Sequence, residues 1–380
     1  MATADPTPAA PPPLPETTGP VLVVGTGLIG TSVGLGLRRR GVDVLLADAS
    51  PTALALARDL GAGSPAADRA ATAPALVLVA VPPDVTPAVV RAHLDRWPRA
   101  VVTDVAGVKG PVLAAVSASG AADRFVGGHP MAGRERSGPL AARADLFEAR
   151  PWVVTATPGT SDAARARVGS LARDLGAVVV DMGAAEHDEA VAVVSHLPQL
   201  AASLVAARLR GAGDRAVGLA GQGLRDVTRI AASDPVLWAQ ILAANAVPVH
   251  RALTELRDDL DGLLAALHGL ATLPPGEQAP GALAVLAGVV RDGNDGQRLI
   301  PGKHGGGPVE YALVGVLVPD RPGEIAHLLS DVHAAGVNLE DIRIEHSLGR
   351  PTGLVEIAVG PAVRDSLVAA LTARGWRIAA

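Results

Sequence analysis

Short apolar runs alternate with amphipathic stretches along the first 180 residues of the chain. The runs are rich in valine and leucine and have the length of buried strands; they cover residues 21–24, 42–47, 76–81, 100–103, 152–156 and 177–181. Stretches with helical periodicity follow several of them and cover the residues up to Arg40, 51–60, 87–94 and 162–175. This alternation predicts an α/β fold with a parallel, doubly wound sheet over residues 21–184.

The pattern changes after residue 184. Strand signals vanish there, and long segments rich in alanine and leucine predict an all-helical domain over residues 185–295. Pro198 lies inside one of these segments and removes the hydrogen bond normally made to the carbonyl of Val194, which predicts a bend in the helix.

The ends of the chain have their own patterns. Residues 1–20 are rich in proline and alanine and are expected to form a disordered tail. Residues 296–308 are rich in glycine and are expected to form a linker. Residues 309–380 predict the order strand, helix, strand, strand, helix, strand, which is the ferredoxin-like βαββαβ arrangement.

Composition excludes several classes of protein. With 49% hydrophobic residues, 19% charged residues and a net charge of −5, the chain is neither disordered nor suited to nucleic acid. It has no cysteine, which excludes disulfides and thiolate chemistry, and its histidines show no metal-binding spacing, so no metal site is expected. The apolar stretches 17–37 and 190–207 are interrupted by glycines or polar residues and do not predict membrane spans. The N-terminus has no signal-peptide pattern, so the cytoplasm is expected.

A glycine motif follows the first strand. Gly25, Gly27 and Gly30 have the spacing G-x-G-x-x-G, open a helix, and are followed by Asp48 at the end of the next strand. This context is typical of a dinucleotide-binding Rossmann domain, in which free N–H groups of the helix bind the pyrophosphate. The acidic residue favours NAD over NADP, because a carboxylate binds the ribose hydroxyls and repels a 2′-phosphate. The expected contacts are Gly25, Gly27, Leu28, Ile29, Gly30 and Asp48; the alternative is a sheet turn without a ligand.

Polar residues that could take part in catalysis or in substrate binding occur in three further segments. His129, between Gly-Gly and Pro, is expected in a loop after a sheet strand and is a candidate base, or else a solvated histidine. Ser195 and His196 lie beside Pro198 and are candidates to line a cavity, with a buried structural histidine as the alternative. Arg225 and Arg229 are four residues apart, so one helix face could present both guanidinium groups to carboxylates, or both could be solvated.

Taken together, these segments resemble the prephenate dehydrogenase family over nearly everything after residue 20. The matching blocks are Val24 to Gly30, Ala80-Val81-Pro82-Pro83, Thr103-Asp104-Val105 with Val108-Lys109-Gly110, Gly127 to Gly133, Ser195-His196-Leu197-Pro198, Arg225-Asp226 with Thr228-Arg229-Ile230-Ala231, and Ser233-Asp234-Pro235 with Trp238. The C-terminal turn Asp320-Arg321-Pro322-Gly323, with Asn338 downstream, resembles an ACT regulatory domain.

The resemblance implies a reaction. In that family NAD⁺ takes a hydride from C4 of the prephenate ring, the 4-hydroxyl loses its proton, CO₂ leaves, and 4-hydroxyphenylpyruvate forms in tyrosine biosynthesis. By resemblance His129 deprotonates the hydroxyl and must be neutral to do so. Glu135 shapes the pocket electrostatically, and Val81 and Pro82 join the cofactor contacts.

The resemblance also implies partners. Arg229 would hold a substrate carboxylate with Arg225 beside it, and His196 would contact the substrate from the helical domain. That domain would form a homodimer. An aromatic amino acid, most simply tyrosine, would bind as an effector through residues of the last domain, namely Asp320, Arg321, Gly323 and Asn338.

One departure from the family pattern affects catalysis. Ala106-Gly107 stands where a Gly-Ser pair is expected, so the serine hydroxyl that assists the catalytic histidine in relatives is absent. Three alternatives remain beside prephenate oxidation. They are arogenate dehydrogenase, a non-catalytic sensor of NAD and amino acids, and a generic hydroxyacid dehydrogenase. The last alternative does not explain why the helical domain carries the family blocks Ser195 to Pro198 and Thr228 to Ala231.

Overall fold

The computed structural model describes residues 14–69, 71–133, 137–274, 277, 279–301, 311–346 and 351–379. The chain divides into two compact units, Met1–Leu256 and Arg257–Ala380. The division falls inside the long helix Ala246–Ala271. One helical domain was expected over residues 185–295. The bounds of that domain stay a prediction.

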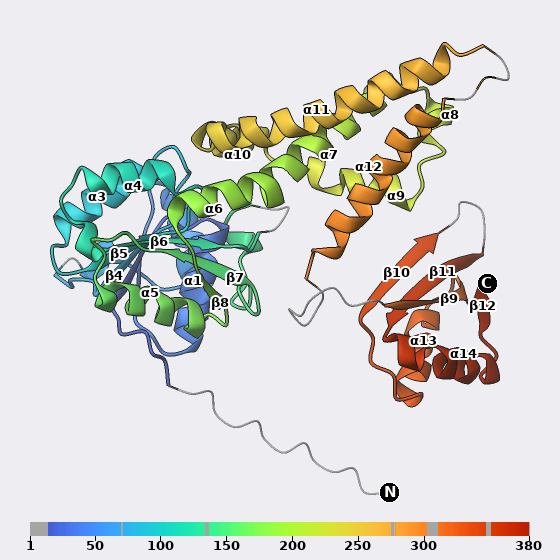
Figure 1. Ribbon diagram of the computed structural model, residues 1–380. Coiled ribbons are helices and arrows are strands. Elements are labelled where there is room, and N and C mark those ends of the chain that lie inside the picture. The colour runs from blue at the N-terminus through green and yellow to red at the C-terminus, as the bar shows by residue number, and fades with distance from the viewer. Residues whose placement is uncertain are drawn as a thin grey trace, which may run out of the picture. The chain divides into compact units, whose positions relative to one another are not determined.

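The first unit contains an eight-stranded sheet with strand order β3-β2-β1-β4-β5-β6-β7-β8 (Figure 1). Its strands are β1 (Val21–Val24), β2 (Val44–Ala47), β3 (Ser64–Pro65), β4 (Leu76–Val79), β5 (Val101–Asp104), β6 (Phe125–Pro130), β7 (Pro151–Thr155) and β8 (Val178–Asp181). Alternate residues of β1 point into two different hydrophobic cores, which is why the whole strand is apolar.

Helices cover both faces of this sheet, as a doubly wound fold requires. Val33 of α1 (Leu28–Arg39) and Leu171 of α5 (Asp162–Asp174) contribute to the core on one face, together with α2 (Pro51–Asp59). Val90 of α3 (Thr86–Arg96) and Val112 of α4 (Gly110–Ser117) contribute to the core on the other face. The predicted α/β architecture is therefore confirmed.

The prediction of an all-parallel sheet is wrong at one position. Strands β1 to β6 pair in parallel, and so do β7 and β8, but β6 pairs with β7 in antiparallel register, with His129 opposite Val153. A parallel pair needs a crossover that returns to the starting edge, usually a helix. The described part of the β6–β7 connection contains no crossover helix, only the short 3₁₀ turn Pro139–Ala141, and β7 therefore runs antiparallel beside β6.

The disordered tail predicted for residues 1–20 is wrong for residues 14–20. The backbone N–H groups of Glu16 and Thr17 donate hydrogen bonds to the Asp174 carboxylate over 3.2 and 2.7 Å, and the Glu16 side chain forms an ion pair with Arg173. Composition does not reveal these contacts, because their acceptor lies about 160 residues away in the sequence. Residues 1–13 lie outside the described part.

Helices follow the sheet. They are α6 (Ala184–Val191), α7 (Leu197–Arg208), α8 (Asp214–Val217), α9 (Gln222–Thr228), α10 (Pro235–Ala244), α11 (Ala246–Ala271) and α12 (Pro280–Arg298). The irregularity predicted at Pro198 is a π-helical turn, Ala192–His196, which joins α6 to α7 immediately before the proline. Helix α12 extends to Arg298, three residues into the predicted linker.

One helical segment of the described chain, Ala184–Gly211, has the length and apolar composition of a membrane-crossing helix. It carries the buried polar residues Asp188, His196 and Gln199, which is typical of a helix packed inside a protein. The expectation that residues 190–207 do not span a membrane stays a prediction.

The last part of the chain folds in the order β9, α13, β10, β11, α14, β12, and its sheet order is β10-β11-β9-β12 with every pair antiparallel. The bounds are Ala312–Pro319, Glu324–Ala334, Asp341–His346, Thr352–Val359, Arg364–Ala373 and Arg377–Ala379. The strands and both helices share one hydrophobic core. The predicted βαββαβ arrangement is confirmed.

Candidate active site

The three motif glycines have different structural roles. Gly25 has φ +95°, and a Cβ there would collide with the Ala80 carbonyl; a Cβ at Gly30 would collide with the carbonyl of Gly25. A Cβ at Gly27, by contrast, would meet nothing within 4 Å. The turn is therefore closed by its first and third glycines, while the second leaves its backbone open to a ligand, as a dinucleotide site requires.

The helix that starts at this turn suits an anion. Leu28 and Ile29 are the first residues of α1, no acidic residue lies in its first turn, and no side chain caps its free N–H groups. Val81 and Pro82 follow the adjacent strand β4. The free N–H groups at the start of α1 can hold the pyrophosphate of a dinucleotide.

Asp48 is held in place at the end of β2. The backbone N–H and the hydroxyl of Thr26 donate to Asp48 Oδ2 over 2.6 and 2.7 Å, and the N–H of Ser50 donates to Oδ1 over 2.7 Å. Oδ1 accepts only one of these hydrogen bonds and keeps a lone pair for a ribose hydroxyl. The geometry fits the predicted NAD site.

His129 lies in strand β6, so the prediction that it lies in a loop is wrong. The Gly-Gly-His-Pro sequence was interpreted as irregular, but pairing with β7 keeps it extended. The imidazole is half-buried, and its Nδ1 lies 2.8 Å from Nε2 of His187, with the two rings edge to face. Glu135, expected nearby, lies outside the described residues.

His187 continues this contact to a carboxylate. Its Nδ1 lies 2.8 Å from Asp188 Oδ1. The same carboxylate accepts the backbone N–H groups of Lys109 and Gly110, each over 2.8 Å, at the N-terminus of α4. Asp188 thereby ties α6 to α4 and anchors the row Asp188, His187, His129.

A buried ion pair lies beneath His129. The Nζ of Lys109 lies 2.5 Å from Asp104 Oδ2 and donates to the Gly128 carbonyl over 2.6 Å, while the Gly128 N–H donates to Asp104 Oδ1. Both charged side chains are almost fully buried. Burial lowers the pKa of Lys109, and the Asp104 carboxylate opposes this effect. The pair fixes the backbone immediately before His129.

The pKa of His129 lies well below its usual value of 6.5. The largest cause is burial, followed by the positive charge of Lys109 and by His187 and His196. The imidazole is therefore neutral at neutral pH, and a neutral imidazole can accept a proton.

His196 belongs to the same cluster. It is buried in the π-helical turn, where its Nδ1 lies 3.2 Å from Nδ2 of Asn245, and its ring meets Trp238 edge to face. Asn245 Nδ2 also donates to the Asp188 carbonyl over 2.7 Å. The pKa of His196 is lowered, mainly by burial. The structure thus brings His196 and His129 to one network.

Arg225 and Arg229 are both exposed and lie on one continuous helical stretch. Helix α9 ends at Thr228, and Arg229, whose backbone angles are still α-helical (φ −53°, ψ −45°), begins the 3₁₀ turn Arg229–Ala231. That turn packs against α7, the helix that follows His196. The expected pair of arginines on one helix face stays a prediction.

Gly107 faces His129. A Cβ built on Gly107 would lie 3.6 Å from His129 Nε2 and 3.8 Å from Cε1. The position where relatives were expected to carry serine is therefore next to the imidazole nitrogen that His187 does not contact.

The sequence interpretation missed His187, Asp188, Lys109 and Asn245. Glu186 caps its own helix, because its side chain accepts the Gly183 N–H, whereas Asp188 caps α4. A usable signal was Lys109, one of only two lysines in an arginine-rich chain.

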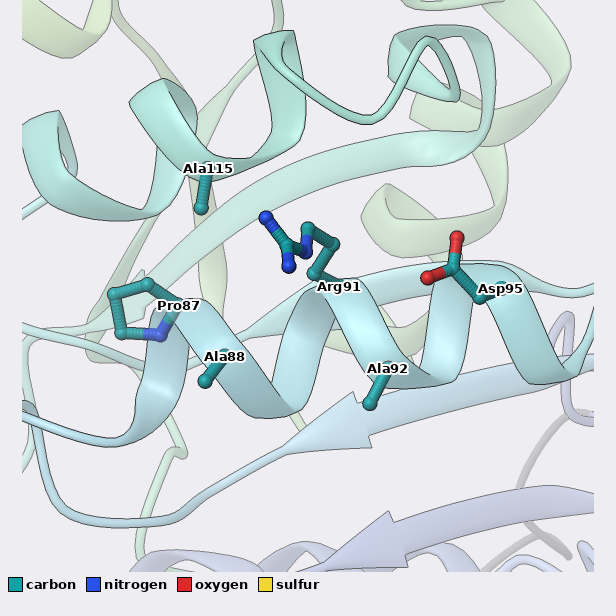
Figure 2. Close-up of a pocket in the computed structure, with 6 residues that line it drawn as sticks. All are labelled: Pro87, Ala88, Arg91, Ala92, Asp95 and Ala115. Carbon is teal, nitrogen blue, oxygen red and sulfur yellow. The ribbon is translucent and has the colours of Figure 1, made fainter.

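Three other regions were compared with the expected sites. Asp320, Arg321 and Gly323 are exposed in the turn between β9 and α13, whereas Asn338 is exposed in the connection between α13 and β10. A surface hollow between α3 and α4 contains none of the expected site residues (Figure 2). Within the described ranges, no group of three or more histidine or acidic residues could hold a metal ion.

Comparisons with known proteins identify the family of this chain. Residues 33–181 match the model of the prephenate dehydrogenase nucleotide-binding domain, and residues 183–271 match the model of the prephenate dehydrogenase dimerization domain. The chain is 40% identical to a probable prephenate dehydrogenase, NovF, of Streptomyces niveus, over 93% of this chain and 98% of that protein.

Solved structures are also similar. The crystal structure of prephenate dehydrogenase from Aquifex aeolicus with hydroxyphenyl propionate and NAD⁺ matches with TM-score 0.62 and 29% identity, over 72% of this chain and 97% of that one. The structure of Synechocystis arogenate dehydrogenase matches with TM-score 0.59 and 27% identity, over 72% and 99% of the two chains. Two family models that together cover more than half of the chain, and a relative matched over almost its whole length, place this protein in the prephenate dehydrogenase family of NAD-dependent oxidoreductases.

Proposed function

We propose that this enzyme oxidises prephenate with NAD⁺ to 4-hydroxyphenylpyruvate and CO₂. The observation that carries the proposal is the imidazole of His129, whose pKa is lowered by burial and which lies at the carboxyl end of β6, in the same sheet whose strand β1 leads into the glycine turn. Ligands of open α/β sheets bind at that end of the strands.

His129 is the base in this proposal. Its Nε2 accepts the proton of the substrate's 4-hydroxyl as hydride leaves C4. Bound NAD⁺ supplies the hydride acceptor. Loss of CO₂ returns an electron pair to the ring, the ring becomes aromatic, and His129 returns the proton to the phenolate oxygen. No net proton is released, and a base held in place serves both transfers.

Substrate carboxylates are assigned to basic residues of the helical part. Arg229 holds one carboxylate, Arg225 adds positive charge, and His196 contacts the substrate. The support is the exposure of both guanidinium groups and the hydrogen-bond network that links His196 to the His129 cluster. Glu135 is assigned to the pocket on the family resemblance alone.

The enzyme is proposed to act as a homodimer in the cytoplasm. The match to a dimerization-domain model and the apolar side chains exposed on the helical part support the dimer. These side chains are Val193, Val194, Leu204, Val205, Val236 and Leu237.

The C-terminal βαββαβ unit is proposed to be an ACT domain that binds tyrosine at Asp320, Arg321, Gly323 and Asn338. Gly323 has φ +92° and starts α13, so the turn keeps its shape only with a residue that tolerates this conformation. Inhibition requires unequal affinity of tyrosine for two states of the enzyme. Equal tyrosine affinity with and without prephenate and NAD⁺, measured by calorimetry, excludes this regulation.

The substrate is tested by following NADH formation with prephenate or arogenate and with NAD⁺ or NADP⁺. Turnover of prephenate with NAD⁺ is expected to have the highest kcat/KM. The similarity to Synechocystis arogenate dehydrogenase makes arogenate the second candidate. A higher kcat/KM with arogenate would identify arogenate as the substrate and leave the proposed oxidative decarboxylation unchanged. Binding of NAD⁺ without turnover of either substrate indicates a sensor instead.

A further inference from the structure

We propose that His187 and Asp188 act as positioning residues that hold His129 in one tautomer, with its proton on Nδ1 and its lone pair on Nε2. The proposal rests on the assignment of His129 as the base. It follows from a chain of hydrogen bonds in which each partner fixes the proton position of the next.

The chain starts at the Asp188 carboxylate. Burial raises the pKa of Asp188, but hydrogen bonds from His187 and from the N–H groups of Lys109 and Gly110 outweigh burial, so the pKa lies below its usual value. An ionised carboxylate only accepts hydrogen bonds. The proton between the side chains of Asp188 and His187 therefore lies on Nδ1 of His187.

The next link fixes His129. A neutral imidazole with a proton on Nδ1 has a lone pair on Nε2. The proposal takes His187 as neutral; its Nε2, 2.8 Å from Nδ1 of His129, then accepts the hydrogen bond and Nδ1 of His129 donates it. The lone pair of His129 is then on Nε2, the nitrogen that faces Gly107, a residue without a side chain.

The same chain stabilises the proton once it is transferred. When Nε2 of His129 accepts the substrate proton, the ring becomes cationic, and burial, Lys109, His187 and His196 all disfavour that charge. Asp188 is the carboxylate in contact with the relay, and Asp104 is already paired with Lys109. The Asp188 carboxylate, which holds His187 by a hydrogen bond, offsets part of that positive charge electrostatically.

Two substitutions of His187 separate positioning from simple packing. His187→Leu removes both hydrogen bonds, so kcat is expected to fall about 100-fold with little change in the KM for prephenate. His187→Gln can donate to Asp188 and accept from His129, so it is expected to recover at least about tenfold of that loss. His250→Leu, at an exposed position in α11, is the matched control and should not change kcat.

The tautomer of His129 can be measured by nuclear magnetic resonance without any turnover, which tests the proposal directly. In ¹⁵N-histidine-labelled enzyme, with the His129 signals assigned by their loss in His129→Asn, Nε2 is expected to be unprotonated and Nδ1 protonated above pH 7. In His187→Leu this preference should disappear, while NAD⁺ affinity and far-ultraviolet circular dichroism stay unchanged.

The outcomes are distinguishable. A proton on Nε2 of His129 in the wild-type enzyme, or an unchanged tautomer in His187→Leu, overturns the proposal whatever the activity. The expected tautomer in an enzyme that turns over neither substrate supports the positioning role and contradicts the proposed function. Equal kcat losses in His187→Leu and His187→Gln, with the tautomer unchanged in both, point to packing alone.

Discussion

The Cβ position of Gly107 lies 3.6 Å from Nε2 of His129, so the residue at 107 controls the space in front of the proposed base. A serine there would place a hydroxyl within hydrogen-bond reach of Nε2, whereas a valine would place methyl groups where the substrate hydroxyl must lie. Gly107→Ser is therefore expected to keep kcat within about fivefold of the wild type, and Gly107→Val to lower it at least about tenfold. NAD⁺ affinity, measured by fluorescence, should be unchanged in both. A fully active Gly107→Val enzyme means that the substrate binds elsewhere.

The lowered pKa of His129 predicts how activity responds to acid. The base works only when neutral, and burial together with Lys109 lowers its pKa well below 6.5. Activity is therefore retained as the pH falls through 6.5 and is lost only below it, when His129 takes up a proton. The profile of kcat/KM for prephenate from pH 5 to 9 is expected to show its acid limb below pH 6.5. An acid limb above pH 6.5 would contradict the conclusion that burial and Lys109 lower the pKa of His129.

The Lys109–Asp104 pair predicts a large effect on stability. Removing one partner leaves the other charge buried, so Lys109→Met or Asp104→Asn is expected to lower the free energy of unfolding by about 3 to 5 kcal/mol. The double variant should recover part of that loss, because no uncompensated charge remains. Urea denaturation measures all three. The exposed pair Arg257 and Asp258 serves as the control, since Arg257→Met should leave the unfolding midpoint unchanged.

Asp48 is expected to decide between the two nicotinamide cofactors. Asp48→Ala removes the carboxylate that Thr26 and Ser50 hold in place, so kcat/KM for NAD⁺ should fall about tenfold while the preference against NADP⁺ weakens. Asp43→Ala, just before the same strand, is the control and should leave both values unchanged. An unaltered cofactor preference in Asp48→Ala would place the ribose away from this carboxylate.

Local patterns were sufficient to predict most of the fold. Runs such as Val21 to Val24 predict buried strands because both faces of the sheet are covered, and the glycine spacing predicts the turn because steric crowding at Gly25 and Gly30 excludes other residues. The antiparallel pairing of β6 with β7 was not predictable in this way. It depends on how the chain returns from Pro130, and no residue pattern in β6 itself encodes that direction.

The candidate site was predictable only where one residue carries the signal. His129 stands out by its Gly-Gly-His-Pro context, and His196 by its place before Pro198. His187 and Asp188 act through partners about 60 to 80 residues away in sequence, so no local pattern identifies them as site residues. Long-range hydrogen bonds of this kind are visible only once α6 is placed against α4.

The most direct test of the account is turnover by His129→Asn. Asparagine can still donate a hydrogen bond to His187 but has no nitrogen in place of Nε2, so the base is removed with little disturbance of its surroundings. The account predicts that kcat with prephenate and NAD⁺ falls at least about 100-fold while the Kd for NAD⁺ stays within about threefold of the wild type. A kcat within about threefold of the wild type would contradict the assignment of His129 as the base.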